Sequence, residues 1–175
     1  MPWHRGVMAD VTLRPGRPDD APRLTEYHHR CWVAAFASLF PPGAVDGLDP
    51  WRRLPVFEYW LSSDATDTTV TVAEVAGVAV GHTVVIGSGV AHVFVDPDHW
   101  GGGLGRRLLD AAERIVAGNG FATAELHTMV GNERALALYR GSGWQVTDRF
   151  DTMEDGELVW DEHVLLKDLG GPEGT

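Results

Sequence analysis

A cluster of glycines between a predicted strand and a predicted helix restricts the fold of this chain more than any other feature. Residues 101–105 contain four glycines, follow a Val-rich run that ends at Val95, and precede an amphipathic helix predicted at 104–117. Main-chain N–H groups at a helix start carry partial positive charge, and glycines leave them uncovered. The pattern therefore predicts a phosphate-binding turn, with a merely flexible turn as the other interpretation of the glycines alone.

Two common nucleotide-binding loops fit this cluster poorly. A P-loop requires Lys and then Ser or Thr after its last glycine, whereas Gly105 is followed by Arg106 and Arg107. A Rossmann fingerprint opens the first βαβ unit of its domain, whereas these glycines follow three strands that look antiparallel. Binding of ATP or NAD through the glycine turn is therefore the weakest of the functional hypotheses.

Apolar spacing and turn residues divide the rest of the chain into strands and helices in the order β-α-α-β-β-β-α-β-α-β-β. This order predicts a mixed sheet with helices on its faces, which is an α/β or α+β fold. Strands are predicted at 11–14, 68–75, 78–86, 90–95, 121–129, 144–150 and 158–166, and helices at 20–39, 49–61, 104–117 and 132–140.

Length, charge and cysteine usage exclude several classes of protein. A chain of 175 residues favours one domain, placed at 11–169, with flexible ends at 1–10 and 170–175. No apolar run is long enough to cross a bilayer, and the single Cys31 cannot form an internal disulfide, which together favour a cytoplasmic protein. The net charge of −11 disfavours nucleic acids and anionic membranes as partners. The histidines lack the spacing of metal ligands, so no metal is expected.

Two sequence blocks point to one family. Residues 92–109 read HVFVDPDHWGGGLGRRLL. This stretch resembles the core motif of the GNAT acyltransferase superfamily, in which a strand ending in Val-x-Pro precedes Arg/Gln-x-x-Gly-x-Gly/Ala. Gly103 and Gly105 match the two glycine positions, and Trp100 stands where the family has Arg or Gln.

The second block supports the same resemblance. Residues 132–144 read NERALALYRGSGW and are similar to the family's Asn-x-x-Ala-x-x-x-Tyr-x-x-x-Gly-Phe/Trp pattern. The likeness extends loosely over residues 11–167, with its specific motifs confined to these two blocks. Two ordered blocks at the right separation are far more specific than either block alone.

The resemblance implies a GNAT fold and acetyl-CoA as co-substrate. Such a fold has a mostly antiparallel mixed sheet of about seven strands, about four flanking helices, and a splay between its fourth and fifth strands. The splay leaves main-chain groups for the pantetheine amides, and the glycine turn binds the pyrophosphate. The implied coenzyme contacts are Val93, Phe94, Val95, Trp100, Gly101, Gly102, Gly103, Leu104, Gly105, Arg106, Asn132 and Tyr139.

The resemblance also implies transfer of an acetyl group to a primary amine by direct attack in a ternary complex. Tyr139 matches the family tyrosine that protonates the departing thiolate, although helix tyrosines are commonly core residues. For the general base we rank His92 first and His127 second, because they lie on the two strands of the predicted splay. His82 and Glu125 are further candidates beside the acceptor, and each histidine also has a purely structural interpretation.

The acceptor is predicted to be an amine of a small molecule or a peptide. Trp32 and Phe36 lie on the first predicted helix, which borders the acceptor cleft in GNAT folds, and can hold a cation through their rings. Core packing is the alternative role for these aromatics. A module that binds acyl-CoA as a sensor without turnover is the alternative function, and association into a homodimer is left open.

Overall fold

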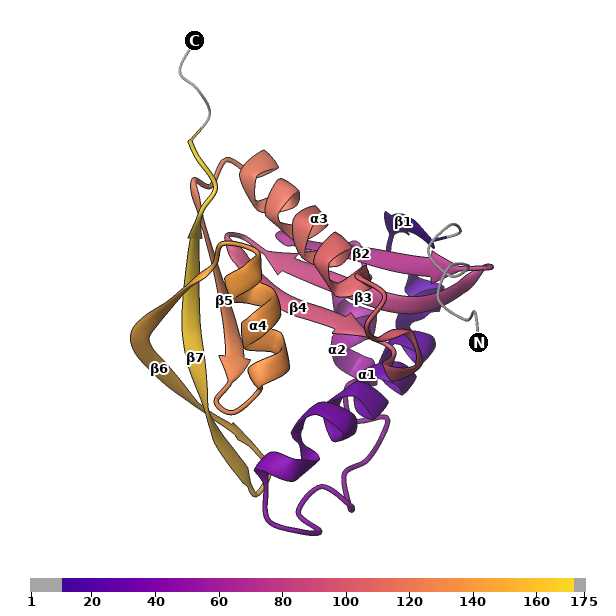
Figure 1. Cartoon of the computed structure of the whole chain (residues 1–175). Coiled ribbons are helices and arrows are strands. Elements are labelled where there is room, and N and C mark those ends of the chain that lie inside the picture. Colours follow the sequence, from indigo (N-terminus) through magenta and orange to yellow (C-terminus); the bar gives the residue numbers. More distant parts are fainter. Residues whose placement is uncertain (1–10, 172–175) are drawn as a thin grey trace, which may run out of the picture.

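A computed structural model describes residues 11–171 of the chain and contains one seven-stranded sheet in the order β1-β2-β3-β4-β5-β7-β6 (Figure 1). The strands are β1 (Val11–Pro15), β2 (Thr68–Val75), β3 (Val78–Ile86), β4 (Gly89–Val95), β5 (Thr123–Met129), β6 (Gln145–Asp155) and β7 (Leu158–Asp168). The helices are α1 (Ala21–Phe36), α2 (Leu54–Trp60), α3 (Leu104–Gly118) and α4 (Glu133–Gly141). This arrangement confirms the predicted fold class and the order of its elements.

The sheet parts between β4 and β5, as predicted. These two strands form the parallel pair of the sheet, and they pair only at Gly89↔Glu125 and Val90↔Leu126. On β3, Val85 pairs with Val90 and Val84 pairs with His92, so Ala91 is an extra residue of β4. A bulge of this kind bends its strand, and this one lies directly after the last β4–β5 pair. The bend therefore occurs where the two strands begin to diverge.

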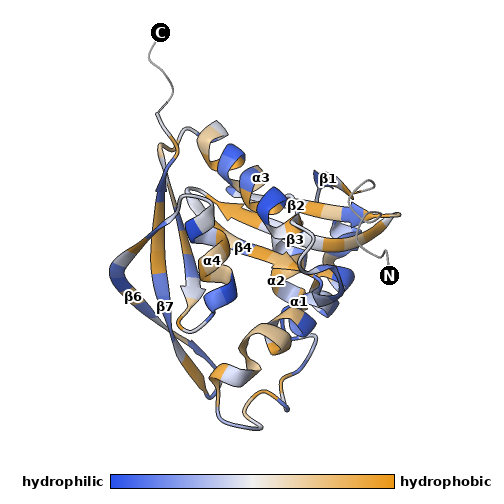
Figure 2. Cartoon of the chain, viewed as in Figure 1, coloured by the Kyte–Doolittle hydropathy of each residue, from blue (hydrophilic) through white to orange (hydrophobic). Residues whose placement is uncertain are grey.

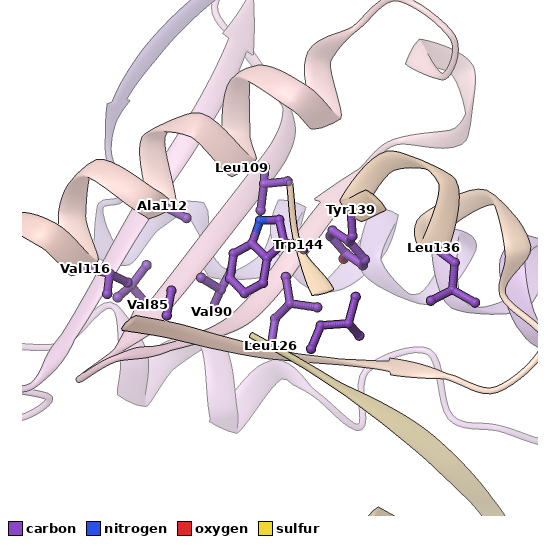
Figure 3. Packing of buried hydrophobic residues seen from close by; sticks show 11 residues of the cluster. Val85, Val90, Leu109, Ala112, Val116, Leu126, Leu136, Tyr139 and Trp144 are labelled. Atoms are coloured by element: carbon purple, nitrogen blue, oxygen red, sulfur yellow. The ribbon is translucent and has the colours of Figure 1, made fainter. Parts of the chain in front are cut away.

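Helices cover both faces of the sheet. On one face, α1 and α2 bury Tyr27 and Phe57 against the strands. On the other face, α3 and α4 lie over the sheet, and the alternation of polar and apolar residues along α3 is visible in its colouring (Figures 1 and 2). Leu109, Trp144 and Tyr139 fill the space between these helices and the strands (Figure 3). The two layers place the splay at the centre of the molecule.

The helix predicted at 49–61 is wrong in its first half. Residues 50–53 form turns, and α2 begins at Leu54. The carboxylate of Asp49 accepts a hydrogen bond from the Trp51 N–H at 2.9 Å, which is a turn contact that competes with helix initiation. The first predicted helix also ends as an α-helix at Phe36, and its last three residues form a 3-10 turn.

The C-terminal hairpin is longer than its apolar pattern predicts. The strand β6 continues to Asp155, where the prediction ended at residue 150, and β7 continues to Asp168. The extension of β6 is acidic and polar, which fits its position at the edge of the sheet, where side chains face solvent. Within residues 11–171, no helix has the length and apolarity to span a bilayer. Of the ends predicted to be flexible, 1–10 and 170–175, residues 1–10 and 172–175 lie outside the described residues.

Candidate active site

A cavity of about 640 Å³ opens where β4 and β5 part. Its walls come from α1, both parted strands, the glycine turn with the start of α3, one side of α4 and the β6–β7 hairpin. The volume lies within the range typical of small-molecule sites. Residues of both sequence motifs, 92–109 and 132–144, therefore line the same cavity.

The glycine turn forms one end of this cavity. Gly101 and Gly103 have φ angles of +80° and +78°, a left-handed conformation that glycine adopts without steric cost. Gly103 directly precedes α3, and its carbonyl accepts the N–H of Arg107 at 3.2 Å as a first helical hydrogen bond. The N–H groups of the first helical turn precede that bond and are oriented for an anion. Of the loop residues predicted to bind coenzyme, Gly102 is the one that does not line the cavity.

The edge of β4 supplies main-chain groups to the cavity. The N–H of Asp96 bonds to the Val80 carbonyl on β3 at 2.8 Å. Since main-chain groups alternate sides along a strand, Phe94 also faces β3, whereas Val93 and Val95 face the parted side. The main-chain groups of Phe94, which was predicted as a coenzyme contact, therefore point to β3. Phe94 still lines the cavity.

Trp100 anchors the glycine turn to β4. Its indole N–H donates to the Val95 carbonyl at 2.7 Å, and the same carbonyl accepts the Cys31 thiol at 2.7 Å. The guanidinium of Arg134 lies over the Trp100 ring, 3.2 Å from its centroid, and both residues line the cavity. Where the family has a polar residue, this chain therefore has Trp100, and the guanidinium of Arg134 from α4 stacks on its ring. Burial raises the pKa of Cys31 to about 12, so its thiol stays protonated at neutral pH.

Asn132 and Tyr139 lie at the start and near the end of α4. The side-chain oxygen of Asn132 accepts the Ala135 N–H at 3.3 Å, so Asn132 caps the N-terminus of α4. Tyr139 is 7% exposed, lines the cavity, and packs against Trp144 with ring centroids 6.4 Å apart. Burial raises the pKa of Tyr139 to about 12, and the charge of Glu162 adds to the effect. Its phenol is therefore protonated at neutral pH.

A hydrogen-bonded chain of three side chains leads from α1 to the cavity. The hydroxyl of Tyr27 lies 2.8 Å from Nδ1 of His82, and Nε2 of His82 lies 3.1 Å from Nδ1 of His92. His28 stacks on His92 with ring centroids 5.1 Å apart and an interplanar angle of 12°. Burial lowers the pKa of His82 to about 3 and holds the pKa values of His28 and His92 well below their usual range. All three rings are therefore neutral at pH 7.

His82 does not reach the predicted acceptor site. Its ring is fully buried and is absent from the cavity wall, where His92 stands in front of it. The two histidines predicted to meet across the gap, His92 and His127, line the same cavity but belong to separate hydrogen-bonded groups. The sequence predicted that both lie on the strands of the splay, whereas their hydrogen-bond partners come from other segments of the chain.

His127 lies within a group of carboxylates on the other side of the cavity. Its Nε2 is 3.0 Å from Glu125, and its Nδ1 is 3.3 Å from Asp151 and 3.7 Å from Glu162. The hydrogen bond from His127 lowers the pKa of Glu125, and Arg149 acts in the same direction. This group makes the β5–β7 wall of the cavity acidic.

Aromatic rings close the cavity beside this acidic wall. Trp32 and Phe36 line it as predicted, with ring centroids 5.3 Å apart. Trp160 of β7 meets Trp32 edge-on at 6.0 Å, so the C-terminal hairpin completes a wall that starts on α1. Sequence reasoning missed Trp160 because nothing local marks a strand tryptophan as a neighbour of the first helix.

Several other cavity residues also had no signal in the sequence. Arg53, Arg134 and Glu162 line the cavity only because the tertiary fold brings the segment before α2, the helix α4 and the strand β7 around the splay, and Asp151 of β6 contributes through its contact with His127. Within the described part of the chain, no group of three or more histidine, cysteine, aspartate or glutamate residues is arranged to hold a metal ion.

In the GNAT fold, the sheet parts beside a helix that begins at a glycine-rich turn. The structure of this chain has the same arrangement and therefore defines its class. The chain belongs to the acetyltransferase (GNAT) family, whose model matches residues 21–144. The mycothiol acetyltransferase of Beutenbergia cavernae is 31% identical over an alignment of 132 residues, and the match covers 69% of this chain. The chain spans only 42% of the length of that relative.

Solved structures share the fold at low sequence identity. The PaiA N-acetyltransferase of Thermoplasma acidophilum, in complex with coenzyme A, has a TM-score of 0.74 at 17% identity, covering 91% of this chain and 99% of its own. YncA of Salmonella typhimurium, solved with its cofactor acetyl-CoA, has a TM-score of 0.70 at 20% identity, covering 95% and 98% of the two chains. At these identities the likeness is one of fold.

Proposed function

We propose that the protein is an N-acetyltransferase that transfers the acetyl group of acetyl-CoA to a primary amine. The observation that carries the proposal is the meeting, in one cavity, of a glycine-cleared helix start, an open strand edge and a buried tyrosine. Coenzyme A has the matching parts in one extended molecule, namely a diphosphate, an arm with two amides, and a thiol. Membership of the GNAT family and neighbours solved with coenzyme A or acetyl-CoA support the same assignment.

The residues of the cavity suit each part of this ligand. The first N–H groups of α3 bind the diphosphate, and Arg134 adds a positive charge on the Trp100 ring. The open groups of Val93 and the N–H of Val95 pair with the amides of the arm, as an added strand would. This arrangement directs the thioester past Tyr139 into the part of the cavity between His92 on β4 and His127 on β5.

The chemistry is attack of the amine nitrogen on the thioester carbonyl, followed by breakage of the C–S bond. Main-chain N–H groups at the splay stabilise the negative charge that develops on the carbonyl oxygen. Tyr139 donates a hydrogen bond to the departing sulfur, which finally receives a proton equivalent to the one that the amine loses. We assign removal of the amine proton to His127 and its carboxylates, because they form the wall that attracts an ammonium ion.

Two measurements test the proposed function. Calorimetric titration with coenzyme A, ATP and NAD is expected to show micromolar binding for coenzyme A alone. Release of free thiol from acetyl-CoA in the presence of a broad panel of amines is expected to reveal turnover. Binding without any amine-dependent release would favour the module without catalysis, and absence of binding would overturn the assignment.

The glycine turn offers a second prediction with an internal control. Gly103→Ala places a side chain at a φ of +78°, which costs about 1–2 kcal/mol for an L-residue and moves the N–H groups that bind phosphate. We expect a loss of coenzyme A affinity of about tenfold, measured by calorimetry.

The control is the same substitution at the other end of the same helix. Gly118 is the last residue of α3, and a side chain there meets nothing within 4 Å. Gly118→Ala is expected to keep full affinity and to raise stability by about 0.5–1 kcal/mol in thermal denaturation. Equal coenzyme affinities of the two variants would contradict the role of the turn.

A further inference from the structure

Arg53 is a cation of the cavity wall without a partner for its charge among residues 11–171. It directly precedes α2, and its Nε atom is buried with no hydrogen-bond partner. The structure contains no ion pair from its guanidinium to a carboxylate of the described residues, whereas neighbouring Arg52 is paired with Asp155. Burial lowers the pKa of Arg53, and no nearby negative charge offsets the effect. A half-buried cation of this kind is costly to the fold unless something binds it.

The protons of the histidine chain have a preferred order that begins at Tyr27. Burial raises the pKa of Tyr27 well above its usual value, so the hydroxyl keeps its proton. Within residues 11–171 its hydrogen-bond partner is Nδ1 of His82, so Tyr27 donates and this nitrogen accepts. The neutral ring of His82 then carries its proton on Nε2 and donates it to Nδ1 of His92. The opposite order would leave the buried hydroxyl proton unpaired, at a cost of about 1–3 kcal/mol.

His92 therefore presents an N–H group to the cavity. Its Nδ1 accepts from His82, so its own proton lies on Nε2. This Nε2 has no hydrogen-bond partner among the described residues, and it is not among the buried polar atoms left unsatisfied. A ring nitrogen that carries a hydrogen cannot take a proton from an amine. His92 is thus arranged as a donor to the ligand and not as the general base ranked first from the sequence.

We propose that Arg53 and His92 form an oxyanion-binding subsite for the acceptor, and that the acceptor is an amine that also carries a carboxylate. This inference rests on the proposed function and names its substrate class. Both residues line the cavity, and the charge of Arg53 is close enough to contribute to the low pKa of His92. A guanidinium and a neutral N–H donor together match the oxygens of a carboxylate.

The two walls of the cavity have complementary charges for such an acceptor. Arg53 and His92 bind its carboxylate, while Glu125 and Glu162 on the wall around His127, with Asp151 beside that ring, attract its ammonium group. A polyamine would place a positive charge against Arg53, and a neutral amine would leave Arg53 unpaired. The cavity therefore selects amino acids and related amines over both. An amine with a phosphate group shares the oxyanion chemistry and is distinguished by experiment.

Binding experiments test the subsite without turnover. N-acetylated amino acids and their carboxamides differ only in the carboxylate. Each compound is titrated into the protein, and the NMR signals of the Arg53 Nε–H and of the histidine nitrogens are followed. We expect His92 to show a proton on Nε2 at pH 7, and we expect the acids alone to shift the Arg53 and His92 signals. A proton on Nδ1 of His92, or equal shifts with acids and carboxamides, would overturn the proposal.

Kinetics with matched acceptors provide the second arm. Amino acids, their carboxamides, phosphoethanolamine and spermidine are compared as acceptors in thiol release from acetyl-CoA. Amino acids are expected to exceed their carboxamides at least tenfold in kcat/KM, and Arg53→Gln to remove that preference by raising KM. Preference for phosphoethanolamine would reassign the subsite to phosphate, and preference for spermidine would refute it. If the enzyme preferred succinyl-CoA over acetyl-CoA and this preference were lost in Arg53→Gln, Arg53 would bind a carboxylate of the acyl donor. That result would also refute the proposal.

Stability separates a binding role of Arg53 from a structural one. Because its charge has no partner in residues 11–171, Arg53→Gln is expected to keep or raise the melting temperature, whereas a structural arginine would lower it on removal. Arg52→Gln is the matched control, since Arg52 is neutralised by Asp155 and lies off the cavity wall. It is expected to leave the preference between acid and carboxamide within twofold. Coenzyme A affinity, measured in parallel on both variants, reports on the proposed function separately from the subsite.

Discussion

Tyr139→Phe is expected to lower kcat for acetyl transfer by about 100-fold while coenzyme A affinity stays within twofold. The substitution removes only the hydroxyl, and the ring keeps its packing against Trp144 in the cluster between α3 and α4. Steady-state thiol release and calorimetric titration measure the two quantities. A loss of affinity equal to the loss of kcat would instead indicate a role in binding.

The size of this effect follows from the acidity of the phenol. Its pKa is about 12, whereas a thiol has a pKa near 8.5, so full proton transfer from Tyr139 to a free thiolate is uphill by about 5 kcal/mol. In the proposed mechanism Tyr139 therefore acts mainly through a hydrogen bond while the C–S bond breaks, and we place the expected effect at the lower end of general-acid contributions.

The same phenol acidity predicts the pH dependence and a control for the variant. Because the phenol keeps its proton up to about pH 12, its ionisation gives kcat no alkaline limb between pH 7 and 9. Tyr59→Phe is the matched control, because Tyr59 is 54% exposed on α2 and lies off the cavity wall. It is expected to leave kcat unchanged, and a similar loss there would refute a specific role for Tyr139.

Lowering the pH from 7.5 to 5 is expected to reduce the free energy of unfolding by several kcal/mol. His82 has a pKa of about 3 in the folded protein, whereas an unfolded histidine has a pKa near 6.5. The unfolded chain therefore binds more protons below pH 6.5, and stability is lost as the pH falls. At pH 5 this linkage costs about 2 kcal/mol for His82 alone, and His28 and His92 act in the same direction.

Urea denaturation followed by tryptophan fluorescence at pH 7.5, 6 and 5 measures this loss. His28→Phe is the most informative variant. The ring of His28 contacts the rings of Phe57, His92 and Phe94, and phenylalanine keeps a ring at this position but cannot bind a proton. It is expected to reduce the slope of stability against pH by about one proton. Stability that is constant from pH 7 to 5 would show that these rings are not held neutral.

The glycine cluster and the block from Asn132 to Tyr139 predicted the correct fold, because each combines a local backbone requirement with chemistry at short range. A left-handed glycine before α3 and a capping side chain before α4 are decided within a few residues of sequence. The splay between β4 and β5 was predicted through the family resemblance. The bulge at Ala91 that accompanies it has no apolar signature in the sequence.

Predictions about single side chains were less complete. His92 and His127 were ranked as bases from their positions on the two strands of the splay, and that reasoning could not include the hydrogen bonds from Tyr27 and His82 behind His92. His82 was predicted in the acceptor site because a strand pattern gives the face of a residue and not its depth. Arg53 appeared as an ordinary charge in a turn, and only its lack of a partner within residues 11–171 marks it.

Short stretches of sequence decide where most of the strands and helices and the glycine turn form, because backbone conformation and apolar periodicity depend on nearby residues. Tertiary structure alone decided the properties of the groups in the cavity. The order of protons along Tyr27, His82 and His92, the acidity of Tyr139 and the partnerless charge of Arg53 depend on burial and on neighbours from distant segments. Burial sets the cost of each charge and hydrogen bonding sets the position of each proton, and both arise only when those segments pack together.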